Sequence, residues 1–256
     1  MSKLKIIINV AAHKKYQMPK KEIYLPIHVG KALHPELDLG YQGDDTADNI
    51  SIKNKNYNEL TALYWAWKNE DADAIGLVHY RRYLGMRPSK SIEDILTSQQ
   101  IEQLFSNAEI ILPKKRHYWI ESNYSHYVHA HPKEPLDLTR KIIAQKYADY
   151  VPAFDKTMKQ TSAHIFNMFI MKKSDLNLYC EWMFDILSEV EKSLDISNYS
   201  NYQKRVYGFI SERLLDVWIQ TNHKTFVEVP VIYLESQHWV KKIASFVTRK
   251  FGGAKQ

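Results

Sequence analysis

The chain has 256 residues, with 35 Lys and Arg against 29 Asp and Glu, eight Gly and a single Cys. This composition is that of a globular protein and excludes a disordered chain, and the length suits one large domain or two small ones. Cys180 alone permits neither an internal disulfide nor a cysteine-based zinc site, which favours a reducing cytoplasm. The glycines lack the spacing of Gly-rich phosphate-binding loops, so side chains must hold the phosphates of any bound nucleotide.

Short apolar runs rich in β-branched residues alternate with longer amphipathic stretches along the chain. Strands are predicted at residues 5–11, 74–79, 108–112, 165–171 and 227–233. Helices are predicted at residues 58–68, 175–194 and 203–220. Residues 114–135 have weak periodicity and many His, Tyr and Pro residues, which predicts a long loop. The pattern indicates an α/β fold with a mostly parallel sheet flanked by helices, and no apolar run approaches the roughly 20 residues that span a bilayer.

Basic and aromatic residues follow the predicted strand at 74–79. The strand leads into His79-Tyr80-Arg81-Arg82-Tyr83. In an open α/β sheet, ligands bind beyond the carboxyl ends of the strands, so these residues are the first candidates for a site. Arginine presents a planar fork that matches phosphate oxygens, so the cluster could hold a diphosphate. Surface ion pairs at a strand end would explain the two arginines equally well.

Two further strand ends have the same character. The first strand runs into His13, Lys14, Lys15 and Tyr16, and the strand at 108–112 runs into the basic segment 114–116. Either turn taken alone reads as a solvated run of charges. Together, three basic strand ends on one edge would form an electropositive crevice that concentrates anionic ligands.

The acidic residues offer three candidates for metal or proton chemistry. Asp71-Ala72-Asp73 has the Asp-x-Asp form that holds a cation in many sugar-nucleotide transferases, but it precedes a strand and is expected in a turn at the opposite edge. Asp45 could bind a sugar hydroxyl or a cation, although an exposed turn is the simpler interpretation. Glu212 lies beside an apolar helical stripe, so it either enters a cleft as a base or pairs with a neighbouring arginine.

His126, His129 and His131 stand close together in the predicted loop. Imidazoles are common ligands of transition metals, so the motif permits a metal site. No Asp or Glu lies within the motif, and Pro132 and Pro135 favour an irregular lid. An acceptor-binding lid is therefore the first interpretation, a structural loop the second and a metal site the third.

Residues 236–256 are predicted to form a separate basic amphipathic tail. One helical face would carry the apolar side chains of Val240, Ile243, Ala244, Val247 and Phe251. The polar side would carry Lys241, Lys242, Arg249 and Lys250. Such a helix suits an anionic membrane surface, and docking onto the protein's own core is the alternative.

Four segments in order resemble the motifs of a family of bacterial capsular and exopolysaccharide glycosyltransferases, long catalogued as a domain of unknown function. They are residues 57–69 (YNELTALYWAWKN), 75–83 (IGLVHYRRY), 167–171 (NMFIM) and 208–214 (GFISERL). The resemblance implies a single Rossmann-like domain of the glycosyltransferase A type that uses a UDP-sugar, with galactose in pyranose or furanose form as the expected donor. It also implies that the HYRRY motif occupies the place where related enzymes keep metal-binding acids, and we expect basic side chains to replace the metal there.

These observations predict a glycosyltransferase domain over residues 1–235 that moves a hexosyl group from a UDP-sugar to a lipid-diphosphate-linked oligosaccharide in surface polysaccharide synthesis. The enzyme is expected to be cytoplasmic and peripheral on the inner face of the cell membrane, held there by the tail. Arg81 and Arg82 would stabilise the departing diphosphate, and Glu212 or Asp45 would act as base or sugar clamp. Donor contacts are expected from His13, Lys14, Tyr16, His79, Tyr80, Arg81, Arg82 and Asn167. Acceptor contacts are expected from His117, His126, His129 and His131.

No cofactor is expected, although a divalent cation such as manganese stays open. Two alternatives come from other classes: a His-dependent metal hydrolase and a non-catalytic basic module that binds nucleic acid. The net charge of +6 is modest and no nucleic-acid recognition motif is present, so no nucleic-acid partner is expected.

Overall fold

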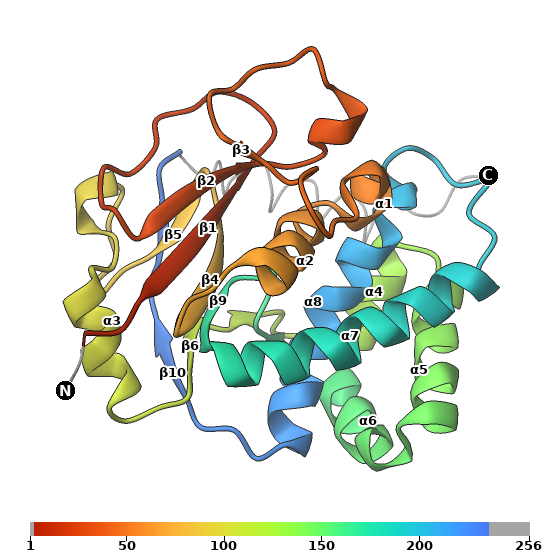
Figure 1. The fold of residues 1–256 in the computed structure, drawn as a ribbon. Coiled ribbons are helices and arrows are strands. Elements are labelled where there is room, and N and C mark those ends of the chain that lie inside the picture. Colours follow the sequence, from red (N-terminus) through yellow and green to blue (C-terminus); the bar gives the residue numbers. More distant parts are fainter. Residues whose placement is uncertain (1–2, 236–256) are drawn as a thin grey trace.

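The computed structural model describes residues 3–235, in which one twisted sheet carries helices on both faces (Figure 1). The strands of the main sheet path are β1 (Ile6–Ala12), β2 (Tyr24–His28), β3 (Gln42–Gly43), β4 (Ala74–His79), β6 (Ile110–Pro113), β9 (Phe169–Lys172) and β10 (Phe226–Val229). Their order is β10-β6-β9-β4-β1-β2-β3. All neighbours pair in parallel except β9, which runs antiparallel to both β4 and β6. The mostly parallel sheet is confirmed.

A short antiparallel extension and a separate ribbon lie beside the main path. β5 (Arg82–Leu84) turns back from β4, and β11 (Val231–Tyr233) pairs antiparallel with β5. β7 (Arg116–His117) pairs with β8 (Ser162–Ala163) in a ribbon of two strands. The end of the described chain therefore returns to the residues that follow β4.

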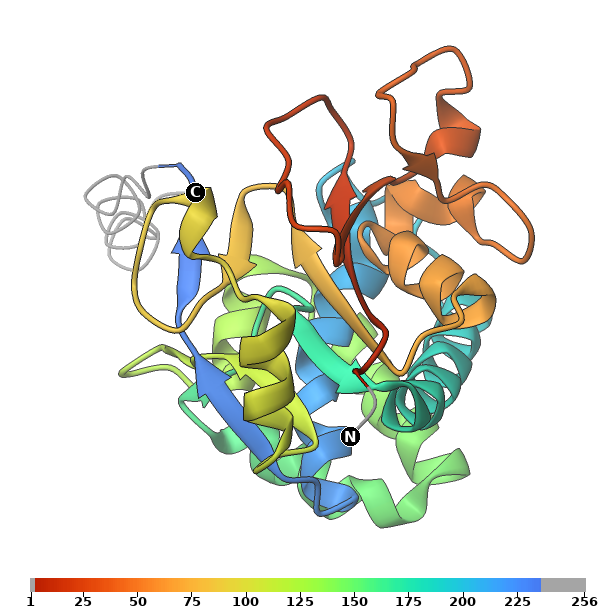
Figure 2. The same cartoon turned by 60° about the vertical axis from the view of Figure 1, so that its left-hand side comes forward.

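Helices cover the two faces of the sheet unequally, as Figure 2 shows. They are α1 (Asn54–Tyr57), α2 (Leu60–Asn69), α3 (Ser98–Phe105), α4 (Asn123–Ala130), α5 (Glu134–Lys146), α6 (Val151–Lys159), α7 (Lys173–Ser193) and α8 (Val206–Thr221). Alternate residues of β4 serve the two cores, because strand side chains point to opposite faces. Ile75 and Leu77 pack in the larger core under α2, α7 and α8, whereas Ala74 and Val78 pack in the smaller core with α3. No helix in residues 3–235 has the length and apolarity needed to cross a bilayer.

The structure departs from the sequence predictions at three places. The strand predicted at 165–171 begins only at Phe169, because Phe166 and Asn167 adopt φ values of 77° and 52° that interrupt an extended chain. The strand predicted at 227–233 is split into β10 and β11 at Pro230, which has no N–H to donate.

The third departure is the predicted loop at 114–135, which is wrong over its second half. Residues 123–130 form α4, whose first turn is capped where the Ser122 side chain accepts from the Ser125 N–H. The turn expected at Asp71–Asp73 is confirmed, since Asp73 accepts from the Lys5 N–H at 2.7 Å, at the amino end of β4. The tail prediction for 236–256 lies outside the described residues.

Candidate functional site

Basic and aromatic side chains gather where β1 and β4 end. Ala11 pairs with His79 across these strands, so the residues that follow them lie side by side at the carboxyl edge. The ring of Tyr80 is the centre of the group: the ring centroids of His13 and Tyr16 lie 5.4 and 5.2 Å away. Lys14 Nζ and Arg81 Cζ lie over the same ring at 5.7 and 4.7 Å. We call these residues, His13, Lys14, Tyr16, Tyr80 and Arg81, the basic rim.

One carboxylate partners the basic rim. Arg81 Nη1 lies 2.7 Å from Glu235 Oε2, and the Tyr16 hydroxyl donates to Glu235 Oε1 at 3.1 Å. The Arg81 and Glu235 side chains are 41% and 42% exposed. The hydrogen bond from Arg81 holds the pKa of Glu235 below its usual range, and the Tyr16 bond adds to this. Arg81 and Tyr16 thus already form a seat for an anionic group.

The charge of the rim rests on Lys14 and Arg81 rather than on its imidazole. Burial lowers the pKa of His13 below its usual value of 6.5, and the neighbouring Lys14 and Arg81 lower it further. A neutral His13 near pH 7 can take up a proton when an anion arrives, because added negative charge favours the imidazolium.

Arg82 has different partners from Arg81. Its Cζ lies 4.5 Å above the ring of Phe166, and its Nε is buried with no hydrogen-bond partner among residues 3–235. His79 Nε2 donates to the Phe166 carbonyl at 2.6 Å. Burial lowers the pKa of His79, so the neutral ring carries its proton on Nε2 and Nδ1 stays unprotonated. The two arginines therefore do not form one joint fork.

Phe166 and Asn167 form a strained turn that side chains hold from several directions. Both residues have positive φ, a conformation that costs a non-glycine residue about 1 kcal/mol or more. The Phe166 N–H donates to Glu212 Oε1 at 3.2 Å, and Asn167 Nδ2 donates to Glu59 Oε1 at 2.7 Å. Ser211 donates its hydroxyl proton to Asn167 Oδ1 at 3.0 Å. We call this segment the clamped turn.

Glu212 on α8, which accepts from the clamped turn, is the carboxyl group there that best suits a catalytic role. Its side chain is 23% exposed, and burial raises its pKa above the usual range. Arg213 opposes this rise from 3.9 Å, and Glu59 adds to it. A carboxyl whose pKa is shifted towards neutrality suits proton transfer. The alternative interpretation of Glu212 is an ion pair with a neighbouring arginine. At 3.9 Å, the Glu212–Arg213 contact is at the longest distance that counts as an ion pair.

A buried imidazole lies behind the clamped turn. His164 Nδ1 is 2.5 Å from Asp216 Oδ1, and Nε2 is 2.9 Å from Glu228 Oε1. Asp216 also accepts from the His164 N–H at 3.0 Å. Burial raises the pKa of Asp216, but the hydrogen bonds from His164 outweigh this and leave it below its usual range. His164 thus fixes the start of the segment that leads to Phe166.

Glycine at position 208 lets α8 approach the turn before α2. A Cβ on Gly208 would lie 2.5 Å from Asn58 Nδ2, too close for any real contact. The Gly208 carbonyl also accepts from Asn167 at 3.3 Å. Glu59, next to Asn58, is thereby brought within reach of the clamped turn.

The histidines of α4 have structural partners. His126 Nδ1 and His129 Nδ1 lie 2.9 and 2.7 Å from the two carboxylate oxygens of Glu121, which is only 5% exposed. The histidine motif contains no acid, but Glu121, just before it in the chain, supplies one. His131 bonds to Gln203 at 2.8 Å. The expected irregular lid is wrong here, because these residues stand on or directly after a helix.

Asp45 lies apart from the residues that follow β4, whereas His117 pairs with Ser162, shortly before the clamped turn. His117 is exposed on β7. Asp45 is exposed after β3, whereas its neighbour Asp44 is buried and accepts from the N–H groups of Gly30 and Lys31. Three strand spacings separate β3 from β4, or about 14 Å. Asp45 and the residues after β4 are therefore on different parts of the carboxyl edge.

No group of three or more His, Cys, Asp or Glu side chains between residues 3 and 235 is arranged to hold a metal ion. The acids nearest the clamped turn, Glu59 and Glu212, are engaged by Asn167 and Phe166.

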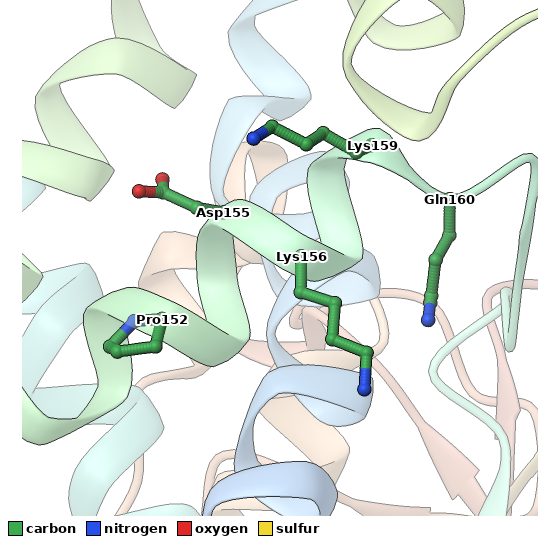
Figure 3. Close-up of a pocket in the computed structure, with 5 residues that line it drawn as sticks. All are labelled: Pro152, Asp155, Lys156, Lys159 and Gln160. Atoms are coloured by element: carbon green, nitrogen blue, oxygen red, sulfur yellow. The ribbon is translucent and has the colours of Figure 1, made fainter.

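A hollow of about 460 Å³ lies on α6, away from all of the predicted site residues. Figure 3 shows its lining side chains, with Lys156 and Lys159 pointing away from each other. Asp155 is bound to Arg140 through two contacts of 2.7 Å. We assign this hollow no role in the site.

Sequence reasoning missed Glu59, Phe166 and Glu235. Glu59 lies inside the segment 57–69 that carries the resemblance, so that motif was a usable signal. Glu235 lies 154 positions from Arg81, and nothing local in the sequence indicates their contact.

Comparison with known proteins identifies the family and the fold of the chain. Residues 7–223 match the family described as a domain of unknown function, DUF4422. A solved structure titled WbbM bifunctional glycosyltransferase, in its apo state, is 31% identical with a TM-score of 0.83, over 91% of this chain and 46% of that chain. The chain thus spans about half the length of that protein, and a search of curated proteins gave no match. The fold is of the glycosyltransferase A type, and the chain belongs to the DUF4422 family, the bacterial polysaccharide glycosyltransferase family that its motifs resemble.

Proposed function

We propose that this domain transfers a sugar from a nucleotide diphosphate donor to a hydroxyl group of an acceptor. The observation that carries the proposal is the placement of the basic rim and Glu212 at one edge of the sheet. The similarity to a protein whose title names it a bifunctional glycosyltransferase supports this activity class.

The basic rim is proposed to bind the donor diphosphate. Arg81 and Tyr16 already hold one carboxylate, that of Glu235. A diphosphate carries more charge than a carboxylate and offers more oxygens, so it would replace Glu235 on Arg81. The fixed cations then stabilise the charge that grows on the diphosphate as the bond to the sugar breaks. Lys14 and a protonated His13 add to this stabilisation.

Glu212 is proposed as the base. The acceptor hydroxyl gives its proton to the Glu212 carboxylate while its oxygen forms a bond to the anomeric carbon. The bond between that carbon and the diphosphate oxygen breaks, and its electron pair leaves with the nucleotide. Because burial raises the pKa of Glu212, the reactive carboxylate form increases as the pH rises. We prefer Glu212 to Asp45, which is exposed at the far end of the sheet.

The finer assignment concerns substrates and setting. We propose a UDP-sugar as donor, with a hexosyl group, galactosyl or galactofuranosyl, as the sugar transferred. The acceptor is a lipid-diphosphate-linked oligosaccharide of capsule or exopolysaccharide synthesis, at the inner face of the cell membrane. His117 and the histidines of α4 lie on the acceptor side in this proposal. Cations of the rim take the place of a metal, and no step is assigned to manganese.

The first test is ligand-induced stabilisation of the protein. Melting temperatures are measured with UDP-, GDP-, dTDP- and CMP-sugars, each with and without manganese, because a ligand that binds the folded state raises its stability. We expect a rise with UDP-sugars that does not require manganese. A rise that occurs only with the metal would contradict the replacement of the metal by basic side chains.

The second test removes the guanidinium group from the rim. Arg81→Ala should reduce turnover about 100-fold or more while the melting temperature stays close to that of the wild type. The matched control is Arg87→Ala, since Arg87 is 76% exposed and pairs only with Asp94 among the described residues. Near-normal turnover of Arg81→Ala would refute the proposed role of the rim.

A further inference from the structure

Two adjacent apolar side chains, Trp119 and Ile120, project from the segment between β7 and α4. They are 84% and 71% exposed, the highest values among the large apolar residues between positions 3 and 235. Trp119 has φ of 64°, a conformation that bulky residues rarely adopt. Strained, exposed apolar residues of this kind point to a binding role, because burial against the protein itself would avoid their contact with water. We call the pair the Trp119–Ile120 tip.

The tip stands on a fixed base. The Tyr118 ring is buried and stacks on the His126 ring, with 4.0 Å between the ring centroids. The backbone N–H of Tyr118 donates to the Thr161 carbonyl at 2.8 Å. The Ile120 N–H donates to the Tyr118 carbonyl at 2.8 Å. Glu121, directly after the tip, is buried and bound to His126. Both ends of the tip are therefore held, and its two side chains are presented without a large loss of conformational entropy on binding.

Three basic residues lie just before the tip in the chain. Lys114, Lys115 and Arg116 precede it, and none of them forms an ion pair with any residue from 3 to 235. Three acids near this segment, Glu121, Asp216 and Glu228, are bound to histidines. The tip therefore follows three cations that form no ion pair with the described residues.

We propose that the Trp119–Ile120 tip and the basic segment 114–116 dock the domain onto an anionic lipid bilayer. Tryptophan favours the interface between headgroups and acyl chains, where its ring is buried and its N–H stays hydrated. Ile120 enters the acyl region beside it, and the three cations lie at the level of the lipid phosphates. A neutral glycan could stack on the Trp119 ring, but it would leave Ile120 and the cations unused.

Docking in this way brings the candidate site to the bilayer. Tyr118, at the base of the tip, packs in one cluster with Ala163, Ile165 and Phe166. Phe166 is the residue of the clamped turn that lies under Arg82. An acceptor carried on a lipid would therefore reach the clamped turn from the membrane side. The docking itself does not depend on the proposed sugar transfer and is tested without donor or acceptor.

The test is cosedimentation of the full chain with vesicles. Vesicles of phosphatidylcholine alone are compared with vesicles that contain roughly 30% phosphatidylglycerol, at low and at high salt. We expect binding to the anionic vesicles that weakens with salt. The double variant Trp119→Ser with Ile120→Ser should lower the partition coefficient about tenfold or more, with an unchanged melting temperature. The matched control, Leu178→Ser on α7, removes an apolar side chain that is 57% exposed and should bind like the wild type.

A second readout locates the inserted ring. Lipids brominated near the headgroup should quench part of the wild-type tryptophan fluorescence. Trp119→Phe should keep most of the vesicle binding and lose most of this quenching. Changing all three of Lys114, Lys115 and Arg116 to Gln should weaken the preference for anionic vesicles.

Four outcomes would overturn the proposal. The first is no binding of the wild type to anionic vesicles, and the second is unchanged vesicle binding of the double Ser variant. The third is undiminished quenching in Trp119→Phe. The fourth is a double Ser variant that loses only the binding of soluble oligosaccharides or its self-association. Each of these is independent of the melting-temperature tests with sugar nucleotides, so failure here leaves the proposed function to its own experiments.

Discussion

The carboxyl edge of the sheet has two parts that hold their charges in different ways. Over β1 and β4, Arg81 of the basic rim is partly exposed, and its one carboxylate partner among residues 3–235 is Glu235, at the end of the described chain. In the clamped turn, Phe166 and Asn167 donate hydrogen bonds to Glu212 and Glu59 and accept them from His79 and Ser211. A partly exposed ion pair such as Arg81–Glu235 contributes little to stability, and in the proposed function the diphosphate replaces Glu235 there. The clamped turn cannot rearrange without breaking several bonds, which suits a group that must keep its position during a reaction.

The largest effect on turnover is expected from Glu212, which holds the clamped turn. Glu212→Gln keeps an oxygen that can accept from the Phe166 N–H but removes the proton acceptor. Turnover should fall about 100-fold or more, while the dissociation constant for UDP changes little. Steady-state kinetics and calorimetric titration with UDP check this. Turnover within threefold of the wild type would show that another group takes the proton.

The rigidity of the fixed part can be tested through its buried support. Asp216→Asn removes one partner of the buried His164 pair and should lower the free energy of unfolding by about 3 kcal/mol in urea titrations. The matched control is Asp155→Asn, which breaks a more exposed pair with Arg140 and should cost less than about 1 kcal/mol. Equal losses in the two variants would mean that the region behind the clamped turn is no firmer than the surface.

A change in the basic rim should strengthen the binding of UDP instead of weakening it. Glu235→Gln removes the carboxylate that competes for Arg81, so UDP should bind about fivefold more tightly by calorimetry. Glu191→Gln, which breaks the Lys53 pair elsewhere, is the control and should leave UDP affinity unchanged. Weaker binding by Glu235→Gln would indicate that Glu235 orients the rim instead of occupying it.

The smallest effect concerns pH. The pKa of His13 is lowered by burial and by Lys14 and Arg81, so the ring is neutral at pH 7 and gains a proton when an anion binds. Proton uptake on binding means that UDP affinity rises as the pH falls from 7 towards 5.5. This rise should be about two- to threefold smaller in His13→Asn. The titration of UDP itself is common to both proteins and cancels in the comparison; identical pH profiles would exclude this role of His13.

The sequence predicted most of the parallel sheet because its strands are buried apolar runs with clear limits, as in β4. It also predicted which strand ends carry cations. The clamped turn was not predictable, because Phe166 has no local reason to adopt positive φ, although Asn167 is of a type that does so more readily. Long-range hydrogen bonds donated to Glu59 and Glu212 hold that conformation. Similarly, α4 escaped prediction because its buried partner, Glu121, precedes the histidine motif.

The pairing of β11 with β5 has a further consequence for how the domain is connected. Because Tyr233 is paired with Arg82, the polypeptide leaves the described fold next to its own anion seat. A shortened chain that ends before Val231 would expose the edge of β5 and free Arg81 from its counterion. Residues that follow Glu235 are attached beside this seat, so in the proposed function the arrival of a diphosphate on Arg81 would release the point of attachment from its ion pair.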